Sequence, residues 1–372
     1  MSELRFGFTT GSCSAAAAKA ATYMLLTGKT IEKISIETPK GIRFDAEILD
    51  CKRAETVTSC CVIKDGGDDP DITTGAHVYA QVSLDDTQSG IWIDGGLGVG
   101  RVTKPGLDQP IGNAAINSVP RQMIQKEVAE VAKLCDYQGG LKVIISIPEG
   151  EELAMKTFNP RLGIVGGISV LGTSGIVEPM SAEALLKTIA VELNQKKALG
   201  MELVPVSPGN YGLDYMRRTY GFDLDASVKC SNFVGDTIAM VKEKAFSGML
   251  LTGHIGKLVK VAGGMLNTHS KYGDCRMEQL RECAELVGAS EQIQLRIMEC
   301  VATEDAVDLL QKEGLAPQVM QMVIERIMKQ LKICAGERLQ IECMMYSNKH
   351  GMLAQSDGAE KMLAKIKKEI ER

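Results

Sequence analysis

The stretch from Thr157 to Ser181, TFNPRLGIVGGISVLGTSGIVEPMS, combines the residue types that best suit ligand binding. Because glycine has no Cβ, the backbone of such a loop can approach a ligand closely, while hydroxyls and N–H groups supply polar contacts. An apolar run, 162–165, precedes the loop, and Ser181 is suited to cap a following helix. Open α/β sheets place ligands in strand–loop–helix segments of this kind. The alternative is a tight crossover turn whose glycines serve packing. The candidate binding residues are Gly166, Gly167, Gly172, Thr173, Ser174 and Gly175.

Two loops in the second half of the chain also follow predicted strands. The strand 203–206 leads into SPGNYG, which contains Gly209 and Asn210. The strand 249–252 leads into GHIGKLVKVAGG. This loop resembles a phosphate-binding P-loop only superficially, because its spacer is wrong and Leu258 replaces the required Ser or Thr. Lys257 still lies at a helix start beyond a strand end, where an anion contact is expected.

The polar loop NTHSKYGDCR contains a pair that could act in proton transfer. His269 is one of only four histidines, and Asp274 follows five residues later, close enough to orient its imidazole. One interpretation is a His–Asp general base. The other is that His269 only hydrogen-bonds the loop or a substrate carboxylate. We expect mutation of His269 to have the milder effect that the second interpretation implies.

Two loops of the first half invite other chemistry. KDGGDDPDITTG, residues 64–75, crowds four aspartates, which favours either a Ca²⁺ or Mg²⁺ site or a solvated turn, although the spacing is not that of an EF-hand. DGGLGVG, residues 94–100, mimics a Rossmann nucleotide loop, but prolines follow where a helix should open. We interpret the second loop as substrate-facing, with Arg101 and Lys104 as anion contacts.

Composition limits the possible functions. The chain has 372 residues, 42 Lys+Arg against 47 Asp+Glu, and only 4% aromatic residues. A net charge of −5 gives no general attraction to nucleic acid or to an anionic membrane, so an anionic substrate needs a local basic cluster. No apolar run approaches the length of a transmembrane helix, and no signal peptide is recognisable. The eleven cysteines form no C-x-x-C pair, which indicates reduced thiols in a cytoplasmic protein and no metal site.

The elements that must position these residues form two domains. A helix from about residue 10 to residue 26, capped by Thr10, Ser12 or Ser14, precedes alternating strands such as 57–63, which predicts an α+β domain with a mixed or antiparallel sheet over 1–150. Repeated strand–loop–helix units predict a Rossmann-like α/β domain over 151–372. The length of the chain agrees with two hydrophobic cores.

Seven motifs taken together resemble the CbiD family, the cobalt-precorrin-5B (C1)-methyltransferases of anaerobic cobalamin biosynthesis. They occur in family order between about residues 6 and 276: GFTTGSCSAAAAKAA, KDGGDDPDITTG, GGLGVGRVTKPGL, AINSVPRQMI, TFNPRLGIVGGISVLGTSGIVEPMS, CSNFVGDT and GHIGKLVKVAGGMLNTHS. The resemblance implies transfer of a methyl group from S-adenosyl-L-methionine to C1 of cobalt-precorrin-5B, giving cobalt-precorrin-6A. Cobalt then belongs to the substrate.

The resemblance carries no established catalytic residue, so the roles are inferred from residue types. The glycine-rich stretch, with Gly209 and Asn210, is assigned to the methyl donor, and His269 and Asp274 to catalysis. The macrocycle bears many carboxylates, for which we expect contacts from Arg101, Lys104, Arg161, His254, Lys257, Thr268 and Ser270. Two other functions remain open, a small-molecule kinase and a non-catalytic tetrapyrrole carrier or assembly protein of the same pathway.

Overall fold

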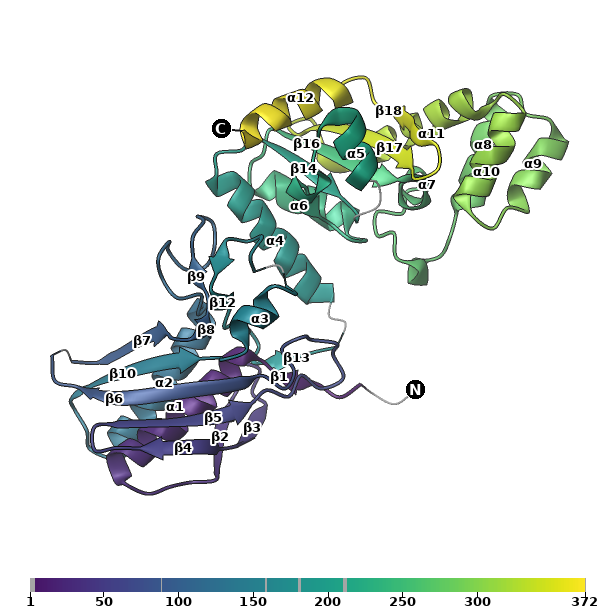
Figure 1. Ribbon diagram of the computed structural model, residues 1–372. Coiled ribbons are helices and arrows are strands. Elements are labelled where there is room, and N and C mark those ends of the chain that lie inside the picture. The colour runs from purple at the N-terminus through teal and green to yellow at the C-terminus, as the bar shows by residue number, and fades with distance from the viewer. Residues whose placement is uncertain (1–3, 88, 158, 180–181, 210–212, 372) are drawn as a thin grey trace. The chain divides into compact units, whose positions relative to one another are not determined.

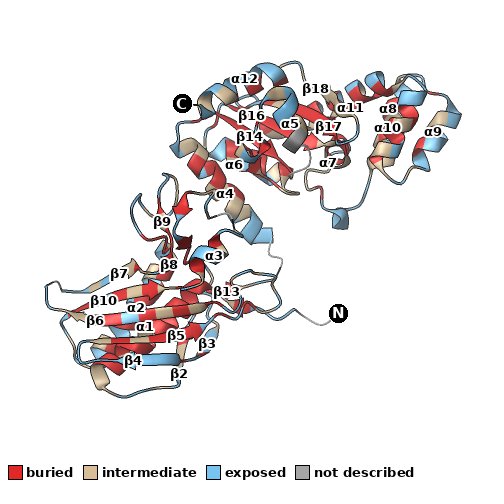
Figure 2. Ribbon diagram, viewed as in Figure 1, coloured by how far each residue is buried: buried red, intermediate tan, exposed pale blue. Residues whose placement is uncertain are grey.

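The computed structural model describes residues 4–87, 89–157, 159–179, 182–209 and 213–371 (Figure 1). The chain divides into two compact units, Met1–Ser181 and Ala182–Arg372. Each has a large cluster of buried apolar side chains of its own, one within residues 13–170 and one within residues 189–366. Figure 2 shows these buried positions concentrated on the inner faces of the sheets and helices of each unit.

Unit 1 is built on a five-stranded mixed sheet with the order β4-β5-β6-β10-β7, in which only β10 and β7 are parallel. Helices α1 and α2 pack against each other, α1 on β5 and β6 and α2 on β7. The elements are β1 (Gly7–Phe8), α1 (Thr10–Thr27), β2 (Lys33–Glu37), β3 (Arg43–Glu47), β4 (Leu49–Arg53), β5 (Val57–Ile63), β6 (His77–Asp85), β7 (Ile91–Gly95), β8 (Gly98–Val99), β9 (Arg101–Val102), α2 (Ser118–Leu134), β10 (Gly140–Ser146), α3 (Gly150–Ala154), β11 (Ile164–Val165), β12 (Gly167–Ile168) and β13 (Ile176–Val177).

The alanine-rich helix α1 is the centre of the unit 1 core. Its small side chains bring the helix close to the sheet, and Ala15 to Ala18 are completely buried. The helix ends at Gly28, whose φ of 74° is the left-handed conformation that glycine adopts readily. The N-cap is Thr9, whose hydroxyl accepts a hydrogen bond from the Ser12 N–H. The predicted caps, Thr10, Ser12 and Ser14, are wrong because Thr10 already belongs to the helix.

Residues 151–181 fold with unit 1, although the sequence predicts a second domain from residue 151. The short strands of this segment pair with strands from earlier in the chain: β11 with β9, β12 with β8 and β13 with β1. The predicted strand, β11, and a helix from residue 182 both form, while the predicted cap Ser181 lies outside the described residues. The expected place in an open α/β sheet is wrong, since β11 and β12 lie in separate two-stranded pairings and not in a five-stranded sheet.

Unit 2 contains a five-stranded sheet with the order β15-β14-β16-β17-β18. The first four strands are parallel and β18 is antiparallel to β17. The elements are α4 (Ala182–Ala198), β14 (Leu203–Ser207), α5 (Leu213–Tyr220), η1 (Leu224–Ala226), β15 (Val228–Lys229), α6 (Val234–Glu243), β16 (Gly248–His254), α7 (Ile255–Ala262), η2 (Ser270–Tyr272), α8 (Arg276–Leu286), α9 (Glu291–Met298), α10 (Thr303–Lys312), α11 (Ala316–Ala335), β17 (Gln340–Ser347), β18 (Gly351–Gln355) and α12 (Ala359–Ile370).

The central strands β14 and β16 are buried along their length, except for the final His254, as expected for parallel strands covered on both faces. Helix α12 packs on β14, β16 and β17, while α6 and α7 pack with α11 (Figure 1). Helices α8, α9 and α10 form a helical group beside α7 and α11. The chain is thus a mixed α/β protein with several sheets, as predicted.

Candidate functional site

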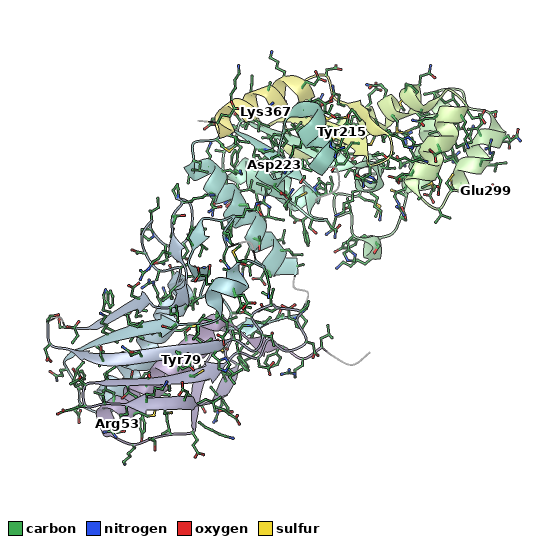
Figure 3. All side chains as sticks on the ribbon, in the orientation of Figure 1. Arg53, Tyr79, Tyr215, Asp223, Glu299 and Lys367 are labelled. Carbon is green, nitrogen blue, oxygen red and sulfur yellow. The ribbon has the colours of Figure 1, made fainter. Side chains whose placement is uncertain are left out.

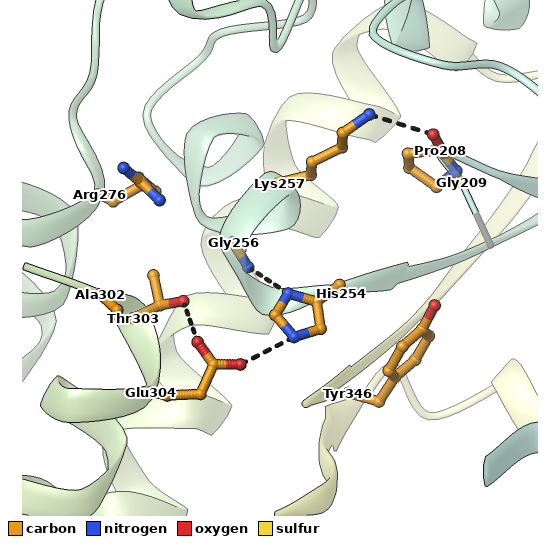
Figure 4. Close-up of a pocket in the computed structure, with 10 residues that line it drawn as sticks. All are labelled: Pro208, Gly209, His254, Gly256, Lys257, Arg276, Ala302, Thr303, Glu304 and Tyr346. Carbon is orange, nitrogen blue, oxygen red and sulfur yellow. Dashed lines mark hydrogen bonds and ion pairs between the residues drawn. The ribbon is translucent and has the colours of Figure 1, made fainter. Parts of the chain in front are cut away.

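A cavity of about 270 Å³ lies in unit 2 at the carboxyl ends of β14, β16 and β17 (Figure 4). Parallel strands present their carboxyl ends at one edge of the sheet, where α/β proteins bind ligands. The volume is at the small end of the range of about 300–1,000 Å³ for ligand pockets. The lining residues are Pro208, Gly209, His254, Gly256, Lys257, Arg276, Ala302, Thr303, Glu304 and Tyr346.

His254 joins the sheet to the helix that borders the cavity. It is the last residue of β16 and the N-cap of α7, and its Nδ1 accepts a hydrogen bond of 3.2 Å from the Gly256 N–H. Its Nε2 lies 2.8 Å from Glu304 Oε1. Because Nδ1 is an acceptor, the proton of the neutral ring is on Nε2 and is donated to Glu304. The contacts therefore assign one tautomer and one ring orientation to His254.

Glu304 brings a carboxylate into the cavity from the start of α10. Thr303 Oγ1 donates to Oε2 at 3.1 Å and Ser347 Oγ donates to Oε1 at 3.3 Å. Burial raises the pKa of Glu304, but the neighbouring His254 and these hydroxyl donors lower it more, so the net pKa lies below its ordinary value. Glu304 is therefore an ionised carboxylate held by donors from β16, α10 and β17.

Lys257 supplies a cation on the first turn of α7. Its Nζ donates to Pro208 O at 3.1 Å and to Ser231 O at 3.2 Å, which ties the loop after β14 to the loop before α6. Burial lowers the pKa of Lys257. An ammonium has three donors, and two of them have acceptors among the described residues.

Tyr346 closes one side of the cavity from β17 and is only 1% exposed. Its ring lies edge-on to His254 with 6.1 Å between centroids, and it stacks on Tyr215 with 6.4 Å between centroids. Tyr215 belongs to α5 (Figure 3). These aromatic contacts fix the wall beside His254.

The predicted His269–Asp274 pair does not form among the described residues. Asp274 accepts from Arg276 Nε and Nη2, and this contact lowers the pKa of Asp274 to about 2. His269 is exposed, and its Nδ1 accepts from the Lys271 N–H at 3.1 Å as the cap of η2. The expected orientation of the imidazole by Asp274 is therefore wrong, since Arg276, two residues further on, takes the carboxylate instead.

The other predicted residues of this loop lie close by in the chain but do not line the cavity. Thr268 is buried, and its hydroxyl lies 3.2 Å from Asn232 Oδ1. Ser270 is an exposed residue of η2. Lys260 holds this loop in place, because its buried Nζ donates to Gly273 O at 3.1 Å.

The glycine-rich stretch lies in unit 1, where several of its glycines contact other backbone segments closely. A Cβ on Gly167 would lie 2.1 Å from the Gly98 carbonyl oxygen, and a Cβ on Gly172 would lie 2.3 Å from Thr9 Oγ1. The Leu171 carbonyl accepts from the Gly11 N–H at the start of α1. These contacts favour the packing interpretation for this stretch.

The remaining residues of the stretch differ in their surroundings. Gly175 O accepts from Ser12 Oγ at 2.6 Å, and the hydroxyl of Ser174 donates to the Ile176 carbonyl. Thr173 has a polar partner of its own. Gly166 has a φ of 81° and open space where a Cβ would be. A cofactor role for these residues stays a prediction.

The predicted basic contacts of unit 1 are partly occupied by protein groups. Arg101 donates to both carboxylate oxygens of Asp94, at 2.7 and 2.9 Å, and to Gly95 O at 2.8 Å. Lys104 is exposed and donates to Arg161 O at 3.2 Å. In the acidic loop, Asp71 accepts from the buried Lys64 at 2.7 Å.

Of the predicted site residues, the cavity brings together Gly209, His254 and Lys257. Asn210 lies outside the described residues. Sequence reasoning missed the partners from distant parts of the chain, Arg276, Glu304 and Tyr346. The local sequence could have indicated Glu304 only through its place beside Thr303 at a helix start. Acidic residues are common at the start of surface helices, so this position does not distinguish a site residue. Within the described ranges, no group of three acidic, His or Cys side chains is arranged to hold a metal ion.

The fold and site define a two-unit α/β protein with a charged cavity at the carboxyl edge of a parallel sheet. Comparison with known families is specific: the CbiD family matches residues 1–179, and the C-terminal domain of CbiD matches residues 267–357. The chain belongs to the CbiD family. None of the helices described here is long and apolar enough to cross a membrane.

The first two of the following similar proteins support this membership over most of the chain. A protein of Ruminiclostridium cellulolyticum named cobalt-precorrin-5B C(1)-methyltransferase is 47% identical over 93% of this chain and 89% of its own length. One of Thermoanaerobacter with the same name is 44% identical over 95% of this chain and 96% of its own length. A crystal structure of the cobalamin biosynthesis protein CbiD from Archaeoglobus fulgidus is 26% identical, covering 72% of this chain and 84% of that chain with a TM-score of 0.40.

Proposed function

We propose that this chain methylates C1 of cobalt-precorrin-5B, with S-adenosyl-L-methionine as the methyl donor, to give cobalt-precorrin-6A in anaerobic cobalamin biosynthesis. The observation that carries this proposal is the 47% identity, over 93% of the chain, to a protein named for this reaction. Family membership over both ends of the chain supports it.

The reaction mainly requires that the methyl donor and the macrocycle be held in the correct relative position. An electron pair on C1 forms the new carbon–carbon bond, while the electron pair of the broken carbon–sulfur bond stays on sulfur, which becomes a neutral thioether. Because the sulfonium methyl is already activated, holding the two reactants in line supplies most of the rate enhancement. The ordered contacts of His254, Glu304 and Lys257 suit a site of this kind.

The macrocycle is too large to be enclosed by the cavity of about 270 Å³. Its carboxylates require cations on accessible surfaces, and we propose the exposed Lys104 and the partly exposed Arg161 in unit 1 as such contacts, although Arg161 also interacts with another group of the chain. Arg101 is a weaker candidate, because Asp94 already neutralises its guanidinium.

We also propose two finer descriptions. Unit 2 is Rossmann-like, which its parallel strands β15, β14, β16 and β17 with helices on both faces support. The protein works in the cytoplasm, which its eleven free cysteines support.

The test is turnover of cobalt-precorrin-5B by the purified full chain with S-adenosyl-L-methionine. We expect equal amounts of methylated macrocycle and S-adenosylhomocysteine, detected by mass spectrometry. Thermal unfolding with S-adenosylhomocysteine and with ATP is the companion measurement, since a ligand that binds only the native state stabilises it. Macrocycle binding without turnover would indicate a carrier, and stabilisation by ATP alone would indicate a nucleotide enzyme; either contradicts the proposal.

A further inference from the structure

The cavity of unit 2 carries charges of both signs on separate walls. Lys257 approaches from the first turn of α7, and Glu304 approaches from the first turn of α10 (Figure 4). In the close-up, the Lys257 side chain extends toward Pro208 and away from Glu304. The Glu304 carboxylate lies beside the His254 ring, at Nε2. A ligand that satisfies both walls must present an anionic and a cationic group a short distance apart.

The cationic wall is suited to a small carboxylate. The first turn of the eight-residue helix α7 borders the cavity through Gly256 and Lys257, so the positive end of the helix dipole lies beside it, although the Gly256 N–H is already donated to His254 Nδ1. The two carbonyl acceptors of Lys257, Pro208 O and Ser231 O, fix its ammonium in place and are its acceptors among the described residues.

The anionic wall is suited to an ammonium. The Glu304 carboxylate accepts from His254, Thr303 and Ser347, and its own backbone N–H is a further partner. These contacts outweigh the effect of burial, so the pKa of Glu304 lies below its ordinary value and the group is a carboxylate. The side chain is 28% exposed and so stays accessible from the cavity.

We propose that this cavity binds the amino-acid end of S-adenosyl-L-methionine, with the α-carboxylate at Lys257 and the α-ammonium at Glu304. The assignment rests on the proposed function, which supplies the identity of the methyl donor. A zwitterionic amino acid carries the two charges that the walls complement, and the cavity volume of about 270 Å³ admits a group of this size.

The other candidate occupant is a carboxylate side chain of the macrocycle. Such a group would pair with Lys257, but the substrate carries many carboxylates, and an ionised Glu304 in the same cavity repels them. The charge pattern therefore favours the donor over the substrate. Arg276 does not alter this balance, because Asp274 pairs with its guanidinium.

The test compares two ligands on the full-length protein by isothermal titration calorimetry. S-adenosylhomocysteine carries the amino-acid end, whereas 5′-methylthioadenosine has the same nucleoside and a thioether but no amino acid.

The variants are Glu304→Gln and Lys257→Met. Their matched controls are Glu313→Gln and Lys242→Met. Glu313 forms an ion pair with Arg296, and Lys242, like Lys257, donates to a backbone carbonyl, but neither lines the cavity.

We expect each cavity variant to lose about 10- to 100-fold in affinity for S-adenosylhomocysteine, the usual range for a hydrogen bond to a charged group. Affinity for methylthioadenosine should change less than about threefold, which also shows that the variant is folded, and the controls should match the unchanged protein. Full affinity of both variants for S-adenosylhomocysteine would overturn the site while leaving the function intact. An equal loss of both ligands in a variant with native thermal stability would also overturn it. An unchanged protein that binds no S-adenosylhomocysteine would contradict the proposed function itself.

Discussion

His254 and its two partners set the character of the cavity at the scale of single residues. A histidine that caps its own following helix through Nδ1 and donates through Nε2 to Glu304 cannot rotate without losing both contacts. The same arrangement keeps Glu304 ionised, because its pKa lies below the ordinary value. Charge and orientation in the cavity thus depend on contacts between three elements and not on any single side chain.

His269 supplies the first test at this scale. We expect His269→Ala to reduce the chemical step by less than about 100-fold in single-turnover experiments with both substrates saturating, because a positioning mechanism leaves little for a general base to add. Among the described residues, the exposed ring accepts from the Lys271 N–H. A larger loss, together with disappearance of a pH limb near the ~6.5 reference pKa of histidine, would make His269 the base.

The Asp274–Arg276 pair predicts a dependence of stability on pH. Because the folded pKa of Asp274 is lowered to about 2, its contribution is complete above the unfolded value of about 3.9 and is lost as pH falls toward 2. Asp274→Asn should therefore lower the free energy of unfolding at pH 6, by less than about 1 kcal/mol since the pair is partly exposed. The difference should shrink between pH 4 and pH 3 in urea titrations; a constant difference would contradict this reading.

At the scale of elements, the short strands of unit 1 are held together by close backbone contacts. Gly98 lies between β12 and the start of α3: a Cβ on Gly167 or on Gly150 would come within 2.1 or 2.0 Å of the Gly98 carbonyl oxygen. Only residues without a Cβ allow these segments to approach so closely. The glycine-rich stretch is thus a packing element of unit 1, whatever ligand its exposed edge contacts.

Substitution of neighbouring glycines separates packing from backbone strain. Gly167→Ala should lower the free energy of unfolding of unit 1 by about 3 kcal/mol or more, because its Cβ meets backbone that cannot move aside. Gly166→Ala is the matched control: its Cβ meets nothing within 4 Å, so only the positive φ costs about 1–2 kcal/mol. Chemical denaturation monitored by circular dichroism measures both. Equal losses would contradict the packing role.

At the scale of the whole molecule, the chain has two large cores that share no residue. Chains with separate cores commonly unfold in more than one step, so a single transition is not expected. The candidate cavity is lined by residues of unit 2 alone. Ligand binding should therefore directly stabilise the core of unit 2.

Calorimetric unfolding tests this separation. With S-adenosylhomocysteine at about 100 times its dissociation constant, we expect a stabilisation of about 2.7 kcal/mol in the transition of unit 2 only. The transitions can be assigned with two buried-leucine variants, Leu141→Ala in unit 1 and Leu250→Ala in unit 2, each expected to cost about 2–5 kcal/mol. A ligand shift confined to the transition that Leu141→Ala lowers would place the binding site in unit 1.

Local patterns in the sequence were sufficient to predict many of the helices and strands. The alanine run of α1, the alternation of β5 and the apolar runs of β14 and β16 predict these elements, because each pattern reflects which face of its own segment is buried. Gly209, His254 and Lys257 each lie a few residues after a predicted strand, and parallel strands share their carboxyl edge, so the sequence indicates this edge for all three. It assigns Gly209 to the methyl donor and the other two to the macrocycle, whereas all three line one cavity.

Only the tertiary structure decided which distant segments meet. Glu304 is fifty residues from His254 along the chain, and no periodicity in either segment encodes their contact. The pairing of β12 with β8 likewise placed the glycine-rich stretch in unit 1, because glycines that permit a ligand to approach also permit another backbone to approach. Asp274 pairs with Arg276 and not with His269, although all three lie in one short stretch, because the local backbone decides which of the groups that could pair do meet.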